Sequence, residues 1–172
     1  MKVFVTGVGG QLGHDVMNEL AKRGHTGIGS DIAPEYSGIQ DGSTVCAAPY
    51  VRLDITDREA VRAVLEQVHP DAVIHCAAWT AVDLAEEMEE KVHAINADGT
   101  RYIAEVCRDL DCKMLYTSTD YVFSGQGDTP WQADCREFAP QNVYGRTKLE
   151  GEMAVAELLQ KYFVVALHGC LA

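Results

Sequence analysis

Tyr144 and Lys148, four residues apart near the C-terminus, have side chains that can carry out a proton transfer. On a helix this spacing places both on one face, within reach of each other. An ammonium group beside a phenol stabilises the phenolate, so we expect Lys148 to lower the pKa of Tyr144 towards the working pH. Tyr144 would then be a general acid for a carbonyl oxygen during reduction, or a base in the reverse direction. The hydroxyl of Thr119 could hold the same oxygen.

A helix and a strand would position these side chains. The pattern predicts a helix from about residue 142 to 161, which carries Tyr144 and Lys148. Residues 113–117 are expected to form a strand, with Thr119 just past its C-terminal end. Ligands of open α/β sheets bind at that end of the strands. Because this Tyr–Lys spacing occurs by chance in many helices, the interpretation depends on a cofactor site elsewhere in the chain.

A glycine-rich turn near the N-terminus predicts that cofactor site. Residues 2–6 form a short apolar, β-branched run suited to a buried parallel strand. Gly7, Gly10 and Gly13 follow at intervals of three, and an apolar helical pattern begins at once with Leu12. Glycines allow tight backbone angles and let a pyrophosphate approach the N–H groups of the helix N-terminus. A strand, a glycine turn and a helix in this order indicate a dinucleotide-binding site.

Asp31 ends the second predicted strand, residues 26–30, about twenty residues past the glycine turn. An acidic side chain there accepts hydrogen bonds from the adenosine ribose hydroxyls. Because a carboxylate repels a 2′-phosphate, Asp31 favours NADH over NADPH. The alternative is an aspartate that caps a helix after the strand.

The rest of the chain alternates between strands and helices. Further strands are predicted at residues 50–53, 72–76 and 162–167, and further helices at about 56–68 and 86–109. Residues 32–49 show neither period, which predicts a long loop or insertion to which we assign no role. The alternation predicts an α/β fold, a doubly wound parallel sheet of the Rossmann type.

Several other residues fall near strand ends or inside helices. Ala77 and Ala78 follow the fourth strand, where small side chains let a cofactor lie close to the backbone. Asn96 lies in mid-helix on an apolar pattern, so its amide should have a partner. The acidic run at residues 86–90 suits the first turn of a helix, and we interpret it as solvated rather than as a metal site.

Composition limits the class of protein. At 172 residues the chain fits one domain, and its net charge of −12 argues against binding nucleic acid or an anionic membrane. The six cysteines show no C-x-x-C pair and no zinc-finger spacing, which is typical of reduced thiols in a cytosolic protein. No stretch is apolar enough to cross a membrane, and the N-terminus enters a strand rather than a signal peptide. We therefore expect a soluble, cytoplasmic protein without a recognisable metal site.

Five segments together resemble the dTDP-4-dehydrorhamnose reductase family, a subgroup of the extended short-chain dehydrogenase/reductases. The matching segments are residues 7–13, 52–57, 77–83, 118–123 and 142–152. The third, A-A-W-T-A-V-D, and the fourth, S-T-D-Y-V-F, are specific to the subgroup, whereas the glycine turn and Y-x-x-x-K are shared by the whole superfamily. The resemblance covers about residues 1–165.

The resemblance implies a role for each candidate residue. The cofactor would be bound by Gly7, Gly10, Gln11, Leu12 and Gly13 at the pyrophosphate, Asp31 at the adenosine ribose, Asp54 and Ile55 at the adenine, Ala77, Ala78 and Thr80 beside the nicotinamide, and Tyr144 and Lys148. Lys148 would hold the nicotinamide ribose, with Asn96 supporting it through backbone and water. Thr119 and Asp120 would meet the sugar, and the catalytic residues would be Thr119, Tyr144 and Lys148.

The implied reaction is reduction by NADH or NADPH of the C4 keto group of dTDP-4-dehydro-L-rhamnose to dTDP-L-rhamnose, with Tyr144 as the acid. The partner would be a small-molecule sugar nucleotide, with a homodimer as a candidate assembly and neither nucleic acid nor membrane involved. Three alternatives stay open. One is a nucleotide-sugar epimerase or dehydratase of the same superfamily, against which S-T-D-Y-V-F speaks. Another is a non-catalytic NAD(P)-binding regulatory subunit, as in the β subunit of methionine adenosyltransferase, and the last is an inert truncation product.

The C-terminal end departs from the family pattern. Family members continue for roughly another hundred residues, which form much of the sugar-nucleotide pocket. We therefore expect the substrate domain to be largely missing and the activity of this chain to be doubtful. We expect an NAD(P)-binding domain over residues 1–165 and an atypical tail over 166–172. The family's Arg-Thr-Ala-Trp-Leu-Leu-Gly, back-translated and read one base out of frame, can encode that tail, so our hypothesis is a frameshift.

Overall fold

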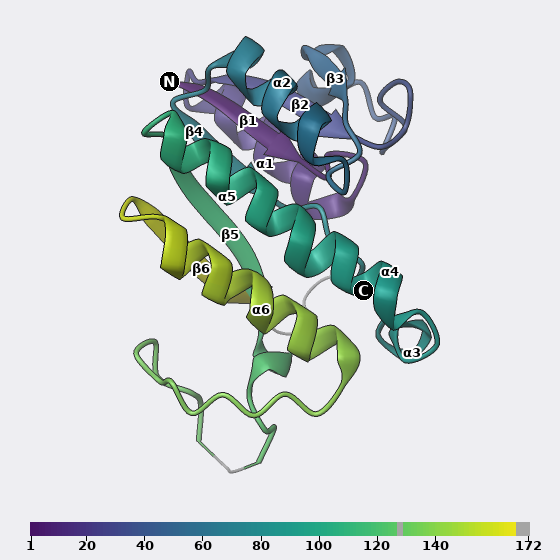
Figure 1. The fold of residues 1–172 in the computed structure, drawn as a ribbon. Coiled ribbons are helices and arrows are strands. Elements are labelled where there is room, and N and C mark those ends of the chain that lie inside the picture. Colours follow the sequence, from purple (N-terminus) through teal and green to yellow (C-terminus); the bar gives the residue numbers. More distant parts are fainter. Residues whose placement is uncertain (127–128, 168–172) are drawn as a thin grey trace.

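The computed structural model describes residues 1–126 and 129–167, which fold around a sheet of six parallel strands (Figure 1). The strands lie in the order β3-β2-β1-β4-β5-β6. Their bounds are β1 Lys2–Thr6, β2 Thr26–Asp31, β3 Tyr50–Arg52, β4 Ala72–His75, β5 Lys113–Thr119 and β6 Tyr162–Leu167. The chain moves outward from β1 to β3 and then continues from β4 on the other side of β1. The predicted doubly wound parallel sheet is confirmed, with its switch point between β1 and β4.

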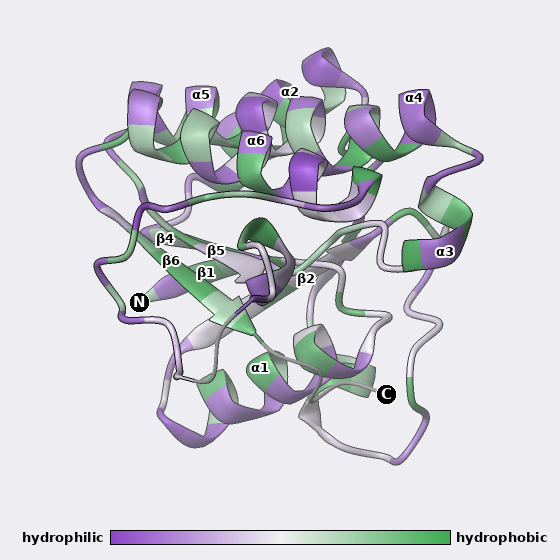
Figure 2. Ribbon diagram, turned by 90° about the horizontal axis from the view of Figure 1, so that it is seen from below, coloured by the Kyte–Doolittle hydropathy of each residue, from purple (hydrophilic) through white to green (hydrophobic). Residues whose placement is uncertain are grey.

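Helices cover both faces of this sheet (Figure 2). α1 (Gln11–Lys22) lies on one face, and α2 (Arg58–Val68), α5 (Gly99–Asp109) and α6 (Val143–Leu158) lie on the other. Two shorter helices, α3 (Val82–Ala85) and α4 (Glu89–His93), precede α5, and short 3₁₀ turns occupy Thr44–Ala47 and Asp120–Val122. Because both faces are covered, the central strands are almost entirely apolar.

The alternation of side chains along β1 divides the core between the two faces. Val3 and Val5 pack with Met17 of α1, whereas Phe4 packs on the other side of the sheet in a cluster that includes Leu65 of α2. Successive side chains of a strand point to opposite faces. A slip of β1 by one residue would exchange the two sets, so burial on both faces fixes its register.

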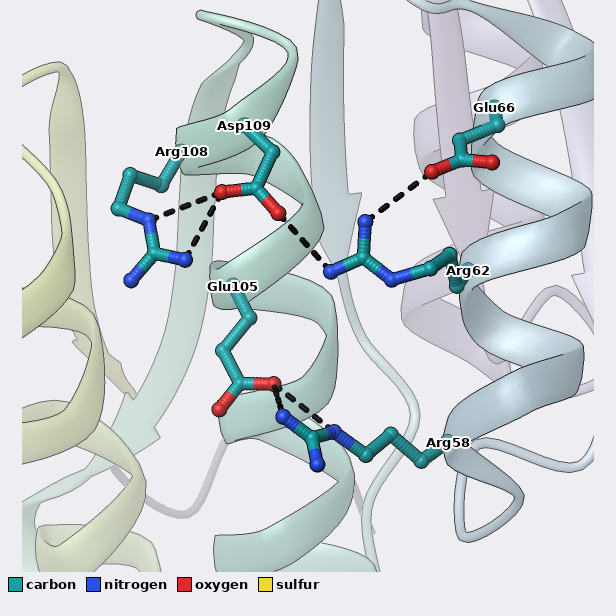
Figure 3. A network of polar contacts seen from close by, with 6 residues as sticks. All are labelled: Arg58, Arg62, Glu66, Glu105, Arg108 and Asp109. Atoms are coloured by element: carbon teal, nitrogen blue, oxygen red, sulfur yellow. Dashed lines mark hydrogen bonds and ion pairs between the residues drawn. The ribbon is translucent and has the colours of Figure 1, made fainter.

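Ion pairs join α2 to α5 along their outer sides (Figure 3). Arg58 Nη2 lies 2.8 Å from Glu105 Oε2, and Arg62 Nη2 lies 2.9 Å from Asp109 Oδ2. Arg62 also contacts Glu66 one turn along its own helix. Pairs this exposed to solvent contribute little to stability, so packing against the core holds the two helices in place.

Residues 32–49 form the expected irregular segment, interrupted by one 3₁₀ turn and fastened to α1. His14 Nδ1 lies 2.8 Å from the Tyr36 hydroxyl, and Asn18 Oδ1 accepts a hydrogen bond from the Val45 N–H at 3.0 Å. His14 is buried. Polar side chains of α1 therefore face this loop rather than solvent.

The helix expected over residues 86–109 begins at Glu89 and runs to Asp109, but its middle is not α-helical. A π-helical stretch, Ala94–Asp98, separates α4 from α5, and α4 begins at Glu89. A π-helical turn holds one residue more than an α-helical turn, so the side chains that follow it are rotated about the helix axis. The hydrophobic pattern predicts a helix here but does not show the π-helical stretch.

The C-terminal strand extends past residue 165, where we expected the domain to end and the tail to begin. β6 runs to Leu167 and pairs through Ala166 and Leu167 with Ser118 and Thr119, so a boundary after residue 165 falls inside a strand. Residues 168–172 of the expected tail lie outside the described residues. The helix expected to reach residue 161 ends at Leu158.

Two further expectations concern membrane-spanning segments and the state of the cysteines. None of the helices in the described part of the chain is long and apolar enough to span a bilayer. The five described cysteines, at positions 46, 76, 107, 112 and 135, are free thiols, and Cys170 lies outside the described residues.

Candidate active site

A cleft of about 790 Å³ opens at the C-terminal ends of the strands, within the size range of cofactor sites. It includes the switch point between β1 and β4, where open α/β sheets bind their ligands. The predicted residues that line it are Gly7, Gly10, Gln11, Leu12, Gly13, Asp31, Asp54, Ile55, Ala77, Ala78, Thr80, Thr119, Tyr144 and Lys148. Asn96 and Asp120 are predicted site residues that do not line it.

The glycine turn between β1 and α1 has no room for side chains at two of its positions. Gly7 has a φ of +73°, and a Cβ on it would lie 2.6 Å from the Ala77 backbone nitrogen. A Cβ on Gly13 would overlap the Gly7 carbonyl oxygen and lie 2.7 Å from the Val8 Cα. These contacts bring the start of α1 against the ends of β1 and β4. A helix N-terminus held at this point fits the pyrophosphate of a dinucleotide.

Asp31 is fixed at the end of β2 by the backbone on either side of it. Its Oδ2 accepts a hydrogen bond from the Gly9 N–H at 2.8 Å, and its Oδ1 accepts one from the Ile32 N–H at 2.8 Å. No α-helix follows Asp31 before residue 58, so the helix-capping alternative does not apply. Each carboxylate oxygen keeps a lone pair for a hydroxyl group, which fits a ribose.

Asn96 lies behind the cleft rather than in it. Its Oδ1 accepts from the Trp79 N–H at 2.8 Å, and its Nδ2 donates to the Trp79 carbonyl and the Thr147 hydroxyl, both at 3.2 Å. The partner expected for this buried amide is therefore the backbone at Trp79 together with α6. Asn96 holds the segment 77–80 in place from the π-helical stretch.

Two members of the acidic run at residues 86–90 form hydrogen bonds or ion pairs with α6. Glu86 Oε1 accepts from the Val143 N–H at 2.7 Å, at the start of α6. Glu89 forms an ion pair with Arg146. These contacts correct the interpretation of the run as a solvated first turn, because two of its members tie the region before α5 to the helix that carries Tyr144.

Tyr144 meets a different environment from the one its spacing predicts. Burial raises its pKa, with the Thr119 hydroxyl acting in the opposite direction. The expectation that Lys148 lowers this pKa is wrong in this structure, because the ammonium group is engaged elsewhere. The phenol therefore keeps its proton at neutral pH, as a general acid must.

Lys148 is buried between α6 and β5. Its Nζ donates to the Thr117 carbonyl at 2.6 Å and lies 4.2 Å from the centre of the Tyr116 ring. Burial lowers the pKa of Lys148 to about 7, with the Glu152 carboxylate acting in the opposite direction. Burial therefore weakens the hold of this lysine on its proton, and the Glu152 carboxylate strengthens it.

Thr119 and Asp120 form the junction between β5 and the 3₁₀ turn that follows. Thr119 Oγ1 accepts from the Tyr121 N–H at 3.2 Å and donates to Asp120 Oδ1 at 3.3 Å. Thr119 lines the cleft, whereas Asp120 lies beside it and acts on Tyr144 through its charge. The structure brings Thr119, Tyr144 and Lys148 into one cleft, as predicted.

His75 is a buried neighbour of the cleft that the motifs do not reveal. It is fully buried at the end of β4, with Nδ1 2.7 Å from Thr6 Oγ1 and Nε2 3.1 Å from Thr100 Oγ1. The Thr6 hydroxyl oxygen also accepts from the Ala77 N–H at 3.2 Å. Burial and the charge of Lys148 lower the pKa of His75 to about 3. A histidine inside an otherwise apolar strand is the sequence signal that could have identified it.

Among residues 1–126 and 129–167, no group of three or more His, Cys, Asp or Glu side chains is arranged to hold a metal ion. The residues of the cleft fit a dinucleotide through the glycine turn, the helix N-terminus and the anchored Asp31.

Comparison with known proteins agrees with this geometry. A sequence model of the family described as RmlD substrate binding domain matches residues 1–169. The chain belongs to that family. Within the RmlD family, it is similar to dTDP-4-dehydrorhamnose reductase of Mycolicibacterium smegmatis, at 38% identity over 165 residues, which cover 95% of this chain and 44% of the relative.

Solved structures give the same picture of the RmlD fold. dTDP-4-dehydrorhamnose reductase of Bacillus anthracis, in complex with NADP, is 34% identical with a TM-score of 0.82, over 97% of this chain and 53% of that one. UDP-glucose 4-epimerase of Brucella ovis, in complex with NAD, is 28% identical with a TM-score of 0.82, over 97% and 51%. The chain therefore spans about half the length of the relatives it matches.

Proposed function

We propose that this chain is the cofactor-binding and catalytic half of an NAD(P)H-dependent reductase that converts dTDP-4-dehydro-L-rhamnose to dTDP-L-rhamnose. The observation that carries the proposal is that Thr119, Tyr144 and Lys148 line the same cleft as the glycine turn and Asp31. Relatives named dTDP-4-dehydrorhamnose reductase support the substrate class.

Each residue of the cleft has a distinct task in this proposal. NAD(P)H, when bound, supplies the hydride for C4 of the sugar. Tyr144 donates its phenolic proton to the keto oxygen, and its raised pKa retains that proton until the oxygen gains charge. The Thr119 hydroxyl hydrogen-bonds the same oxygen. Lys148, one turn further along α6, holds the cofactor ribose through its ammonium N–H donors.

We further propose that NADH is preferred to NADPH. The Asp31 carboxylate is anchored beside the glycine turn, where the adenosine ribose of a dinucleotide lies in this fold. A 2′-phosphate there would place negative charge next to the carboxylate, which is unfavourable. The preference is measured as the ratio of the two dissociation constants.

The test of the reaction is incubation of the chain with NADH and dTDP-4-dehydro-L-rhamnose. Loss of nicotinamide absorbance and formation of dTDP-L-rhamnose, followed by chromatography, would support the proposal. Tyr144→Phe should lower turnover by roughly 10²–10⁴-fold, and Tyr102→Phe on α5, which does not line the cleft, is the matched control. A folded chain that binds NADH and leaves the keto sugar unchanged would contradict reductase activity for this chain.

The same experiment separates the alternatives. Interconversion of UDP- or GDP-sugars with NAD, without net oxidation, would support an epimerase. Bound cofactor without turnover of any sugar nucleotide, together with a co-purifying protein, would support a regulatory subunit.

We also propose a homodimer. β6 is an edge strand, and its Phe163 is 74% exposed, with Val165 also exposed on the same face. Exposed edge strands with large apolar side chains are sites of association. Light scattering would reject this assembly if it gave the mass of a monomer at all concentrations.

A further inference from the structure

Three consecutive residues of β5 contact α6 beneath the cleft. The Tyr116 hydroxyl donates to the Lys148 carbonyl at 3.1 Å, and the Thr117 carbonyl accepts from Lys148 Nζ at 2.6 Å. The Ser118 hydroxyl donates to Glu152 Oε1 in a short hydrogen bond. Strand and helix therefore meet through the side chains of Lys148 and Glu152, which lie one helical turn apart on the same face.

The position of Lys148 is unfavourable for a charge. The residue is 2% exposed, and burial is the largest influence on its pKa, which falls to about 7. An uncompensated ammonium group in such a place loses its proton. The charge that the proposed function requires on Lys148 therefore depends on the groups that surround its ammonium group.

The ionisable groups that face Lys148 come from three elements. His75 and Cys76 lie at the end of β4, Tyr116 lies on β5 with its ring centre 4.2 Å from Lys148 Nζ, and Glu152 lies on α6. Burial makes the first two neutral at physiological pH, since the pKa of His75 falls to about 3 and that of Cys76 rises to about 12. Burial also raises the pKa of Tyr116.

Glu152 is the carboxylic acid of this group. Burial raises the pKa of its carboxyl, whereas the Ser118 hydroxyl and the charges of Lys148 and Arg136 favour the ionised form. A hydroxyl that donates to a carboxylate stabilises its charge. The hydrogen bond from Ser118 thus orients the carboxylate and supports its ionisation.

We propose that Glu152 is a positioning residue of this site: held by the Ser118 hydroxyl, its carboxylate keeps the Lys148 side chain protonated and seated on the Thr117 carbonyl. The inference deepens the proposed function and rests on it where it concerns the cofactor. The protonation of Lys148 itself is a property of the folded chain and does not depend on catalysis.

The test is the titration of Lys148 in the intact chain, followed through its side-chain NMR resonances, which are assigned by their loss in Lys148→Arg. Glu152→Gln should lower the pKa of Lys148 by about one unit or more. Glu152→Asp should restore part of the shift. Glu157→Gln, on the exposed side of the same helix and paired with Arg101, should leave the titration unchanged.

A Lys148 pKa that is the same in Glu152→Gln and in the wild type would overturn the proposal, as would an equal shift in Glu157→Gln. If Glu152→Gln does not fold, Ser118→Ala provides the decision. That variant removes the hydroxyl from the carboxylate and should also move the Lys148 pKa downward, by less than Glu152→Gln. An unchanged pKa in Ser118→Ala would then overturn the proposal.

Cofactor affinity provides a second readout. Affinity for NADH should fall as Lys148 loses its proton, and in Glu152→Gln that fall should begin about one pH unit lower. A wild-type chain that binds no NADH would reject the proposed function, while the NMR titration would still decide the role of Glu152.

Discussion

Acidification should weaken the fold through one buried residue, His75. The Thr100 hydroxyl donates to the Asn96 carbonyl at 2.7 Å, so its oxygen is an acceptor for His75 Nε2–H. The Thr6 hydroxyl then donates to Nδ1. This network assigns the neutral Nε2–H tautomer. A second proton on the ring would leave Nδ1–H facing a donor and would add a positive charge near Lys148.

The magnitude follows from the two states of the chain. His75 titrates near pH 3 when folded, against 6.5 for an unperturbed histidine. Between these values the unfolded chain binds one more proton, so the free energy of unfolding falls as the pH falls. Each pH unit well inside this window is worth about 1.4 kcal/mol, so moving from pH 7 to pH 5 should remove about 2 kcal/mol through this residue.

Urea unfolding of the wild type and His75→Asn at both pH values isolates the effect. Asparagine is smaller and does not titrate, so the variant should be less stable at pH 7 but should lose about 2 kcal/mol less than the wild type on acidification. His25→Asn, which changes a histidine outside the buried network, is the control. Parallel losses in the wild type and His75→Asn would show that His75 is not the source of the pH dependence, as would a His75 ring resonance that titrates above pH 5.

Four further changes test other parts of the account. Gly13→Ala should raise the NADH dissociation constant at least about tenfold by calorimetry, because its Cβ meets the Gly7 carbonyl; unchanged affinity would contradict the tight turn. Asp31→Ser should lower the preference for NADH over NADPH by about tenfold, and an unaltered ratio of dissociation constants would remove Asp31 from that role. In an active protein Tyr144→Phe should lower kcat by roughly 10²–10⁴-fold with NADH binding retained, and equal turnover would exclude it as the acid. Arg62→Ala should lower Tm by at most a few degrees; a larger loss would show that its ion pairs matter more than their exposure indicates.

Most of the strands could be predicted because they are short apolar runs bounded by turn residues. Their bounds differ little from expectation: β3 ends at Arg52, and β5 extends to Thr119. The predicted site residues come from separate segments, and most of them meet because their segments follow the C-terminal ends of parallel strands. The order of the strands along the chain and their parallel direction were therefore enough to predict most of the fold and the outline of the cleft.

What could not be predicted depends on burial and on contacts between distant segments. The direction of the Tyr144 pKa shift follows from how deeply the ring is enclosed, which helical spacing does not show. The place of Asn96 follows from the π-helical stretch, and the pairing of Glu86 with the start of α6 joins residues far apart in sequence. The hydrogen-bond network of His75 likewise joins three elements.

Whether the cleft is a dinucleotide site is decided by calorimetric titration of the chain with NADH and with NADPH. We expect saturable binding at one site, tighter for NADH and weakened in Gly13→Ala. A chain that is folded by circular dichroism and binds neither dinucleotide would contradict it.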